Sequence, residues 1–193
     1  MKSGFMTKKY TLVFAAVAIM VAACLLCLPG CQGETEPLPD LESDLETVEL
    51  LQNVFIDAGY YYYDETTEIY WVYDSDQSKL GYAFYAEGMG VGVPGAEGLE
   101  KIAGPIVILV GIQDTETINK IYVISHHETP QLWDNLVRKG YLDLFSGLKV
   151  SDAYFTRDGG QFDVMSGATL SSTLVLETVR DTMLEKVALL ESS

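Results

Sequence analysis

A run of 20 residues near the N-terminus, residues 10–29, contains no charged side chain. A helix of this length, at about 1.5 Å per residue, spans roughly 30 Å, which is the thickness of the hydrocarbon core of a bilayer. Three lysines and no acid precede the run, whereas residues 33–49 carry seven acids and no base. Because basic residues mark the cytoplasmic side of a membrane segment, this asymmetry predicts an N-terminus in the cytoplasm and the remaining chain outside.

The way in which this anchor ends has two interpretations. Cys24 and Cys31 close the sequences VAAC and LPGC, which are similar to the cleavage box of lipoproteins. In the alternative, the cysteines are small apolar residues of an uncut membrane helix. Both predict one N-terminal anchor in the cell membrane over residues 1–31, a linker over 32–40, and an extracytoplasmic domain over 41–193.

Composition excludes several classes of function for the exported part. No cysteine follows Cys31, so the domain has no disulfide, cysteine metal site or thiol chemistry. All 28 acidic residues lie after residue 33, where only nine of the 12 basic residues are found, which gives a net charge near −19. This charge repels the phosphates of nucleic acids, and we therefore expect no nucleic-acid partner.

The apolar pattern beyond the linker predicts an α+β domain, in which an antiparallel sheet of hairpins packs with helices. The Tyr-rich stretch that begins at Tyr60 is typical of sheet packing, and a binding surface is the alternative. Gly140 is placed to end a short helix that starts near Pro130. The predicted elements are a helix over residues 41–58, strands over 69–73, 80–85, 105–112 and 118–125, and helices over 131–139 and from 171 or 172 to about 190.

A cluster of small and hydroxyl residues, SGATLSST, precedes the last predicted helix. One interpretation is helix capping by Thr169, Ser171 or Ser172, although capping needs only one such residue. Another makes Ser166 a hydrolytic nucleophile, but its neighbours depart from the G-x-S-x-G form, and the two histidines lie about 40 residues upstream.

A third interpretation comes from a family resemblance. The sequence DVMSGAT, residues 163–169, resembles the D-x-x-[ST]-G-A-[ST] motif of FMN-binding domains, in which a flavin transferase esterifies the phosphate of FMN to the final hydroxyl residue. The sequences around the motif and HHETP, residues 126–130, resemble the G subunit of the Rnf ion-translocating complex and, more distantly, the C subunit of the sodium-pumping NADH:quinone oxidoreductase. The likeness runs from about residue 80 to residue 190.

The resemblance implies roles for individual residues. Thr169 is the implied attachment site of covalent FMN through a phosphoester, and Asp163, Ser166, Gly167 and Ala168 are the motif positions that the transferase reads. A second group, in the turn that lies near the flavin in the family, consists of His127, Glu128 and Thr129. The alternative for the histidines is an ordinary surface position.

One departure from the family pattern affects the same turn. The family continues ETPGLG, whereas this chain has ETPQLWDN, with Gln131 and Trp133 in place of the two glycines. If those glycines hold positive φ angles, the turn must follow another path here. Trp133 is then expected to stack on the flavin or to cover a contact with a partner subunit.

The resemblance implies a membrane-tethered flavoprotein that relays electrons, as a subunit of an Rnf-like ion-translocating complex with other membrane redox subunits as partners. A stand-alone FMN-binding lipoprotein in extracellular electron transfer is the second expectation. A non-redox binding module, with the SGAT turn as a helix cap, is the alternative from another class.

Overall fold

The computed structural model describes residues 39–89, 105–166 and 168–192. Its contacts divide the chain into two units, residues 1–38 and 39–193, of which the second forms the domain below. No helix in the described ranges is both long and apolar enough to cross a membrane. The predicted anchor, its cysteines and nearly all of the linker lie outside these ranges.

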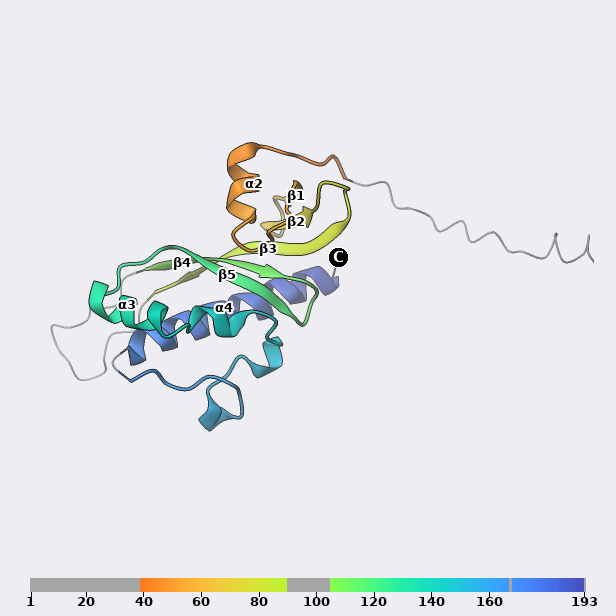
Figure 1. The fold of residues 1–193 in the computed structure, drawn as a ribbon. Coiled ribbons are helices and arrows are strands. Elements are labelled where there is room, and N and C mark those ends of the chain that lie inside the picture. The colour runs from red at the N-terminus through yellow and green to blue at the C-terminus, as the bar shows by residue number, and fades with distance from the viewer. Residues whose placement is uncertain (1–38, 90–104, 167, 193) are drawn as a thin grey trace, which may run out of the picture. The chain divides into compact units, whose positions relative to one another are not determined.

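Five antiparallel strands form one sheet in chain order (Figure 1). Both predicted hairpins are confirmed, since β2 pairs with β3 and β4 pairs with β5. The first strand was not predicted, although it lies in the Tyr-rich stretch for which sheet packing was expected. The strands are β1 (Tyr60–Asp64), β2 (Ile69–Tyr73), β3 (Lys79–Gly88), β4 (Ile106–Ile112) and β5 (Ile118–Ser125).

The first helix of the domain, α2 (Leu45–Leu51), is shorter than the predicted helix over residues 41–58. It begins after Asp44, whose carboxylate accepts a 3.0 Å hydrogen bond from the Thr47 N–H. Val54 and Phe55 continue the apolar spacing and are buried, but they belong to the turn that follows α2. The apolar pattern therefore identified the buried Val48, Leu51, Val54 and Phe55 correctly, but it also included Leu45, which is 71% exposed, and it placed the end of the helix wrongly.

Two further helices agree more closely with the sequence. The short helix α3 (Pro130–Arg138) carries Pro130 in its first turn and is followed by Gly140 at a φ of +69°. The last helix, α4 (Thr169–Ser192), begins two residues before the earliest predicted start. Three short 3-10 turns connect α3 to α4.

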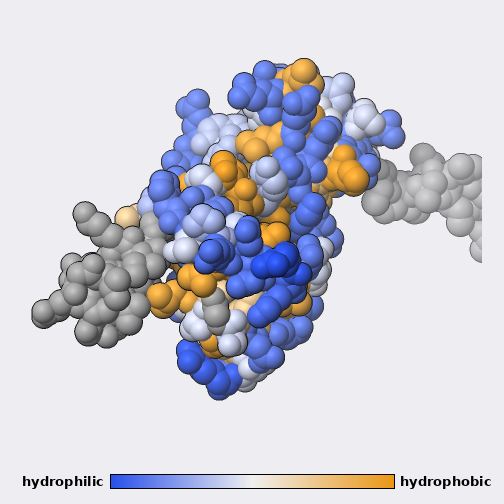
Figure 2. Space-filling model, turned by 60° about the vertical axis from the view of Figure 1, so that its left-hand side comes forward, coloured by the Kyte–Doolittle hydropathy of each residue, from blue (hydrophilic) through white to orange (hydrophobic). Residues whose placement is uncertain are grey.

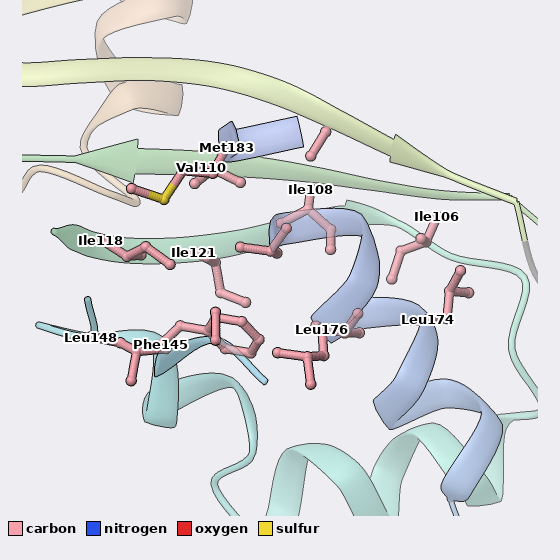
Figure 3. Close-up of a cluster of buried hydrophobic side chains, with 14 of the residues drawn as sticks. Ile106, Ile108, Val110, Ile118, Ile121, Phe145, Leu148, Leu174, Leu176 and Met183 are labelled. Carbon is pink, nitrogen blue, oxygen red and sulfur yellow. The ribbon is translucent and has the colours of Figure 1, made fainter. Parts of the chain in front are cut away.

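The two faces of the sheet carry separate apolar clusters, with α4 on one side and α2 on the other (Figure 1). Alternate residues of β4 contribute to different faces: Ile108 packs in the α4 cluster and Leu109 in the α2 cluster. Phe145 and Leu148 reach the α4 cluster from the 3-10 segment (Figure 3). This arrangement confirms the predicted α+β class.

Charged side chains occupy the surface of the domain. Hydrophilic residues dominate the face in Figure 2, and the apolar residues between them are scattered. Among the described residues, the most exposed large apolar side chains are Ile56, at 85%, and Met89, at 75%.

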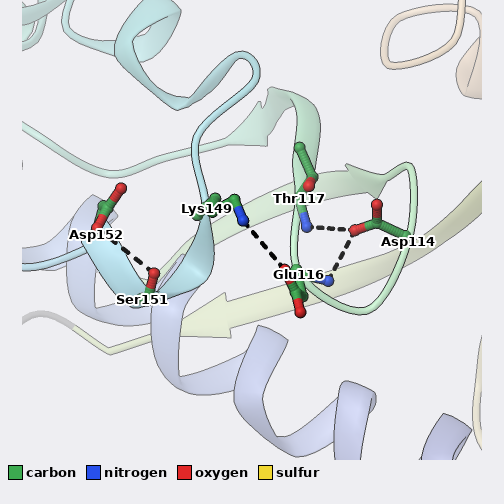
Figure 4. A network of polar contacts seen from close by, with 6 residues as sticks. All are labelled: Asp114, Glu116, Thr117, Lys149, Ser151 and Asp152. Atoms are coloured by element: carbon green, nitrogen blue, oxygen red, sulfur yellow. Dashed lines mark hydrogen bonds and ion pairs between the residues drawn. The ribbon is translucent and has the colours of Figure 1, made fainter.

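The β4–β5 turn is fixed by one carboxylate (Figure 4). Oδ1 of Asp114 accepts hydrogen bonds from the N–H groups of Glu116, at 2.8 Å, and Thr117, at 2.7 Å. Lys149 forms an ion pair with Glu116 at 3.3 Å and attaches the connecting segment to this turn. Asp114 thus supplies the acceptor that the turn backbone needs.

Candidate functional site

The candidate site is centred on the start of α4. Thr169 is the first helical residue and is exposed, and its hydroxyl donates a 3.3 Å hydrogen bond to the Met165 carbonyl. Ala168, only 2% exposed, precedes it, and its carbonyl accepts the first helical hydrogen bond from Ser172. Free N–H groups and the helix macrodipole favour an anion at such a position. The Thr169 hydroxyl therefore lies in solvent where a phosphate group is electrostatically favoured.

The hydroxyl groups of this first turn act as donors. Ser171 donates to Oε2 of Glu128 in a short hydrogen bond, and Ser172 donates to the Thr169 carbonyl at 3.0 Å. Ser171 and Ser172 are both buried. Capping would require these oxygens to accept from backbone N–H groups, so it does not account for the contacts observed.

The segment that leads into the motif is a loop whose two ends are joined by hydrogen bonds. The Thr156 hydroxyl donates a 2.7 Å hydrogen bond to Oδ1 of Asp163, and the Thr156 N–H donates to the Phe162 carbonyl at 2.8 Å. A Cβ on Gly160 would lie 2.1 Å from the Tyr154 carbonyl oxygen, which explains the glycine there. Asp163 is exposed and points to the Thr156 side of the loop, not to Glu128.

Aromatic side chains hold this loop against α4. Tyr141 is 1% exposed, donates its hydroxyl to the Ser172 carbonyl at 3.0 Å, and contacts Phe162 with ring centroids 5.5 Å apart. Phe145 packs on Phe162 at 4.6 Å. Burial raises the pKa of Tyr141 well above its ordinary value of 10.0, so the hydroxyl remains protonated and donating.

The HHETP turn contributes one residue directly to the start of α4. Glu128 is 7% exposed, and its Oε2 accepts from Ser171, whereas its Oε1 is buried and has no hydrogen-bond partner within the described part of the chain. Thr129 is exposed and precedes α3, where its carbonyl accepts from the N–H of Trp133 at 3.0 Å. Of the predicted residues in this turn, Glu128 is the one that forms a hydrogen bond with the first turn of α4 in the described part of the chain.

The two histidines differ in their surroundings. His127 is exposed, and its Nδ1 lies 3.3 Å from the Pro105 carbonyl oxygen. His126 stacks on the indole of Trp133, with centroids 4.0 Å apart and planes at 23°. The His126 Nδ1 is buried without a partner in the described residues. The predicted His127 is thus the exposed histidine of this turn, and His126 is the one that packs on α3.

The departure from the family pattern has a structural counterpart. Gln131 and Trp133 lie inside α3, so a helix runs where the family has its two glycines. The indole of Trp133 is 9% exposed, and one of its faces packs against His126. The indole of Trp133 therefore supports the ring of His126 from one side.

A cation lies beside the SGAT turn. The Lys139 ammonium donates to the Ser166 carbonyl at 3.4 Å, and Ser166 itself is exposed. Gly167 lies outside the described residues. No local pattern in the sequence indicates the contact with Lys139, since the two residues are 27 positions apart.

Comparisons with known proteins agree with the motif. The model of the FMN-binding domain family matches residues 102–183. The G subunit of the ion-translocating oxidoreductase complex of Vibrio vulnificus is 33% identical over 87 residues, which cover 42% of this chain and 41% of that protein. The G subunit of the same complex in Methanosarcina acetivorans is 39% identical over 77 residues, and these cover 39% and 41% of the two chains.

Other relatives give a similar extent of match. The corresponding G subunit of Photorhabdus laumondii is 32% identical over 105 residues, 48% of this chain and 50% of that protein. The chain therefore spans about two-fifths to half of the length of these relatives. Among solved structures, the crystal structure of Shewanella oneidensis NqrC matches 79% of each chain at a TM-score of 0.48 and 16% identity.

The matched residues contain β4, β5, α3, the HHETP turn, the SGAT turn and the first half of α4, which together build the site described above. The expected resemblance is thereby confirmed by the family model and by relatives at 32–39% identity. Over residues 102–183 the chain matches the model of the FMN-binding domain family.

Proposed function

We propose that this protein carries FMN covalently on Thr169, through a phosphoester that a separate flavin transferase forms, and relays electrons. The observation that carries the proposal is the exposed Thr169 hydroxyl at the N-terminus of α4, at the end of the DVMSGAT motif. Bound FMN supplies the redox chemistry, since it accepts and returns electrons. The residues of the chain fix its position and surroundings.

Three features of the described residues fit such a group. The helix N-terminus and the nearby Lys139 ammonium favour the phosphate. The unpartnered Oε1 of Glu128 supplies an acceptor for a hydroxyl or N–H of the flavin. The domain is strongly acidic, so attachment by a bond is more effective than attraction of an anionic cofactor by charge.

We further propose that the protein works as a subunit of an Rnf-like ion-translocating oxidoreductase complex, with other membrane redox subunits as its partners. The names of the relatives support this assignment, as does the likeness in the turn and motif. The apolar run over residues 10–29 would anchor the protein in the cell membrane, with the flavin domain on the extracytoplasmic side.

A second candidate is a stand-alone FMN-binding lipoprotein in extracellular electron transfer. It is favoured by Gln131 and Trp133, which build a helix where the resemblance to the Rnf protein leads one to expect a glycine turn. Metabolic labelling with a lipid precursor separates the candidates, because a lipoprotein incorporates the label at Cys24 or Cys31. A non-redox binding module predicts a colourless protein after expression with a flavin transferase.

The attachment is tested by intact mass and peptide mapping of the full-length chain after co-expression with a flavin transferase. We expect one FMN, less one water, on the wild type and on Thr169→Ser, and none on Thr169→Ala. Thr173→Ala, one turn further along α4, is the matched control and should carry the flavin. An unmodified wild type, or a flavin on another residue, would refute the proposal.

A further inference from the structure

The second half of strand β3 has a partner strand on one side only. β3 has 10 residues and β2 has 5, and the β1–β2 hairpin lies along one end of β3 (Figure 1). The pairing of β2 with β3 ends at Tyr70 opposite Ala83, whereas β4 pairs with β3 as far as Gly88. Within the described part of the chain, Tyr85–Gly88 is therefore an unpaired edge. Its free backbone N–H and C=O groups are a template for a further strand.

A groove runs beside this edge, and helix α4 forms its other wall. It consists of two cavities of about 340 and 220 Å³ that share two lining residues, Glu87 of β3 and Thr182 of α4. The helix lines the groove with residues spaced by four, which lie on one face of a helix. This row comprises Leu174, Thr178, Thr182 and Lys186. The groove therefore follows the strand edge over several turns of α4.

Two contacts fix α4 at the two ends of the groove. At Gly88 the helix lies so close to the strand that a Cβ there would be 1.9 Å from Oγ1 of Thr178. At the other end, the ammonium of Lys186 donates a 2.7 Å hydrogen bond to the Thr67 carbonyl in the β1–β2 turn. Lys186 is only 7% exposed. The walls are thus held in place without a ligand, which lowers the cost of ordering them when one binds.

The charge of the groove is negative. Lys186 pairs with Glu68 at 3.4 Å, and Asp181 pairs with Arg180 at 2.7 Å. The other carboxylates that line the groove have no ion pair within the described residues, and they are Glu87, Glu177 and Glu185. Basic side chains are therefore attracted to this groove, whereas an acidic segment or a second copy of this acidic chain is repelled.

We propose that the groove binds an extended, basic segment of a partner protein, which adds a strand to the free edge of β3. The backbone of the segment forms hydrogen bonds with Tyr85–Gly88, and its alternate side chains, on a period of two, reach the carboxylates of the walls. Neither interaction involves Thr169 or a flavin. The inference goes beyond the proposed function, and either of the two can fail without the other.

The first test uses a synthetic peptide of alternating lysine and valine, about as long as an average strand. Full-length protein in a nonionic detergent should bind it, as measured by calorimetry. The same peptide with every backbone nitrogen methylated keeps the charge but has no N–H donor, and it should bind at least about tenfold more weakly. A peptide of alternating glutamate and valine should not bind. Equal affinity for the methylated and unmethylated peptides would overturn the added strand.

The second test changes one acid on each wall. The double variant Glu87→Lys and Glu185→Lys alters two exposed side chains and should weaken binding of the lysine peptide by about tenfold or more. Glu49→Lys and Glu191→Lys change the net charge equally at exposed positions outside the groove, and this control should stay within about twofold of the wild type. Equal losses in the two double variants would mean that the peptide responds to overall charge and would refute the site.

Hydrogen exchange in the wild type locates the peptide without any substitution. Alternate amides of Tyr85–Gly88, those that do not bond to β4, should exchange in the free protein and become protected when the peptide binds. Protection of all these amides in the free protein, or protection by the peptide only elsewhere, would overturn the inference. A dimer of the free protein that dissociates on Glu87→Lys would also overturn it, because a second copy would then occupy the edge.

Discussion

The hydroxyl of Tyr141 donates a 3.0 Å hydrogen bond to the backbone carbonyl of Ser172, across 31 residues of sequence. Tyr141 follows α3, and Ser172 lies in the first turn of α4, so this bond joins the segment after α3 to the start of α4. Both residues are buried.

Replacing Tyr141 by Phe should lower the free energy of unfolding by about 0.5–1.5 kcal/mol, because one buried hydrogen bond is lost while the ring remains. Burial raises the pKa of Tyr141 above 10.0, so the folded state favours the protonated hydroxyl. The contribution of Tyr141 is therefore complete below about pH 10 and decreases as the pH rises through the raised value. Urea unfolding of both proteins at about pH 8 and about pH 11 measures the difference. An equal difference at the two pH values would contradict the assigned role.

The β4–β5 turn should respond to acid. The hydrogen bond from the Glu116 N–H holds the pKa of Asp114 below its ordinary value of 3.8. The stabilisation by this carboxylate is thus present above about pH 4 and is lost as the pH falls through the lowered pKa. Asp114→Ala should cost about 0.5–1.5 kcal/mol of unfolding free energy at neutral pH and less in acid.

Asp114→Asn is the informative companion, because its amide oxygen still accepts from the turn N–H groups. It should keep most of the stability at neutral pH and lose the part of the acid dependence that Asp114 contributes. Denaturant unfolding between about pH 2 and about pH 7 measures both quantities. An acid dependence identical in Asp114→Asn and wild type would show that this carboxylate does not contribute to it.

Phe145 and Leu144, two adjacent residues of the segment between α3 and α4, differ in burial, so substitutions there test how much packing contributes to stability. Phe145 is fully buried in the cluster that joins the sheet to α4 (Figure 3). Leu144 is 53% exposed. Phe145→Ala should reduce the free energy of unfolding by about 3–5 kcal/mol through lost burial and a residual cavity. Leu144→Ala should change it by less than about 0.5 kcal/mol. Comparable losses from both substitutions would mean that the core does not include this segment as described.

The acidic surface should lower the midpoint potential of the proposed flavin, because negative charges oppose reduction to an anion. Replacing Glu177 and Asp181 of α4 by Gln and Asn should therefore raise the midpoint measured by redox titration. The shift should shrink as salt is added, since the Debye length is about 10 Å at 0.1 M. Glu46 and Glu49 of α2, on the opposite face of the sheet, provide the control pair. An unchanged midpoint at low salt would refute the argument from charge.

Local patterns in the sequence determined much of the fold. Apolar and aromatic runs separated by turn residues identified β2 to β5, and Pro130 and Gly140 marked the two ends of α3. The resemblance of DVMSGAT to the motif of FMN-binding domains implied the candidate attachment site, and this motif is a run of consecutive residues. Each of these signals involves residues that are close in the chain, so the order of neighbours is sufficient to find them.

Tertiary structure decided the remaining features. The Ser171–Glu128 bond joins residues 43 positions apart, and it left one carboxylate oxygen without a partner among the described residues. The different surroundings of His126 and His127 likewise follow from contacts with other elements. The sequence specifies which polar groups a turn contains. Whether these groups are buried and hydrogen-bonded depends on the distant side chains that the packing of α3 and α4 brings against them.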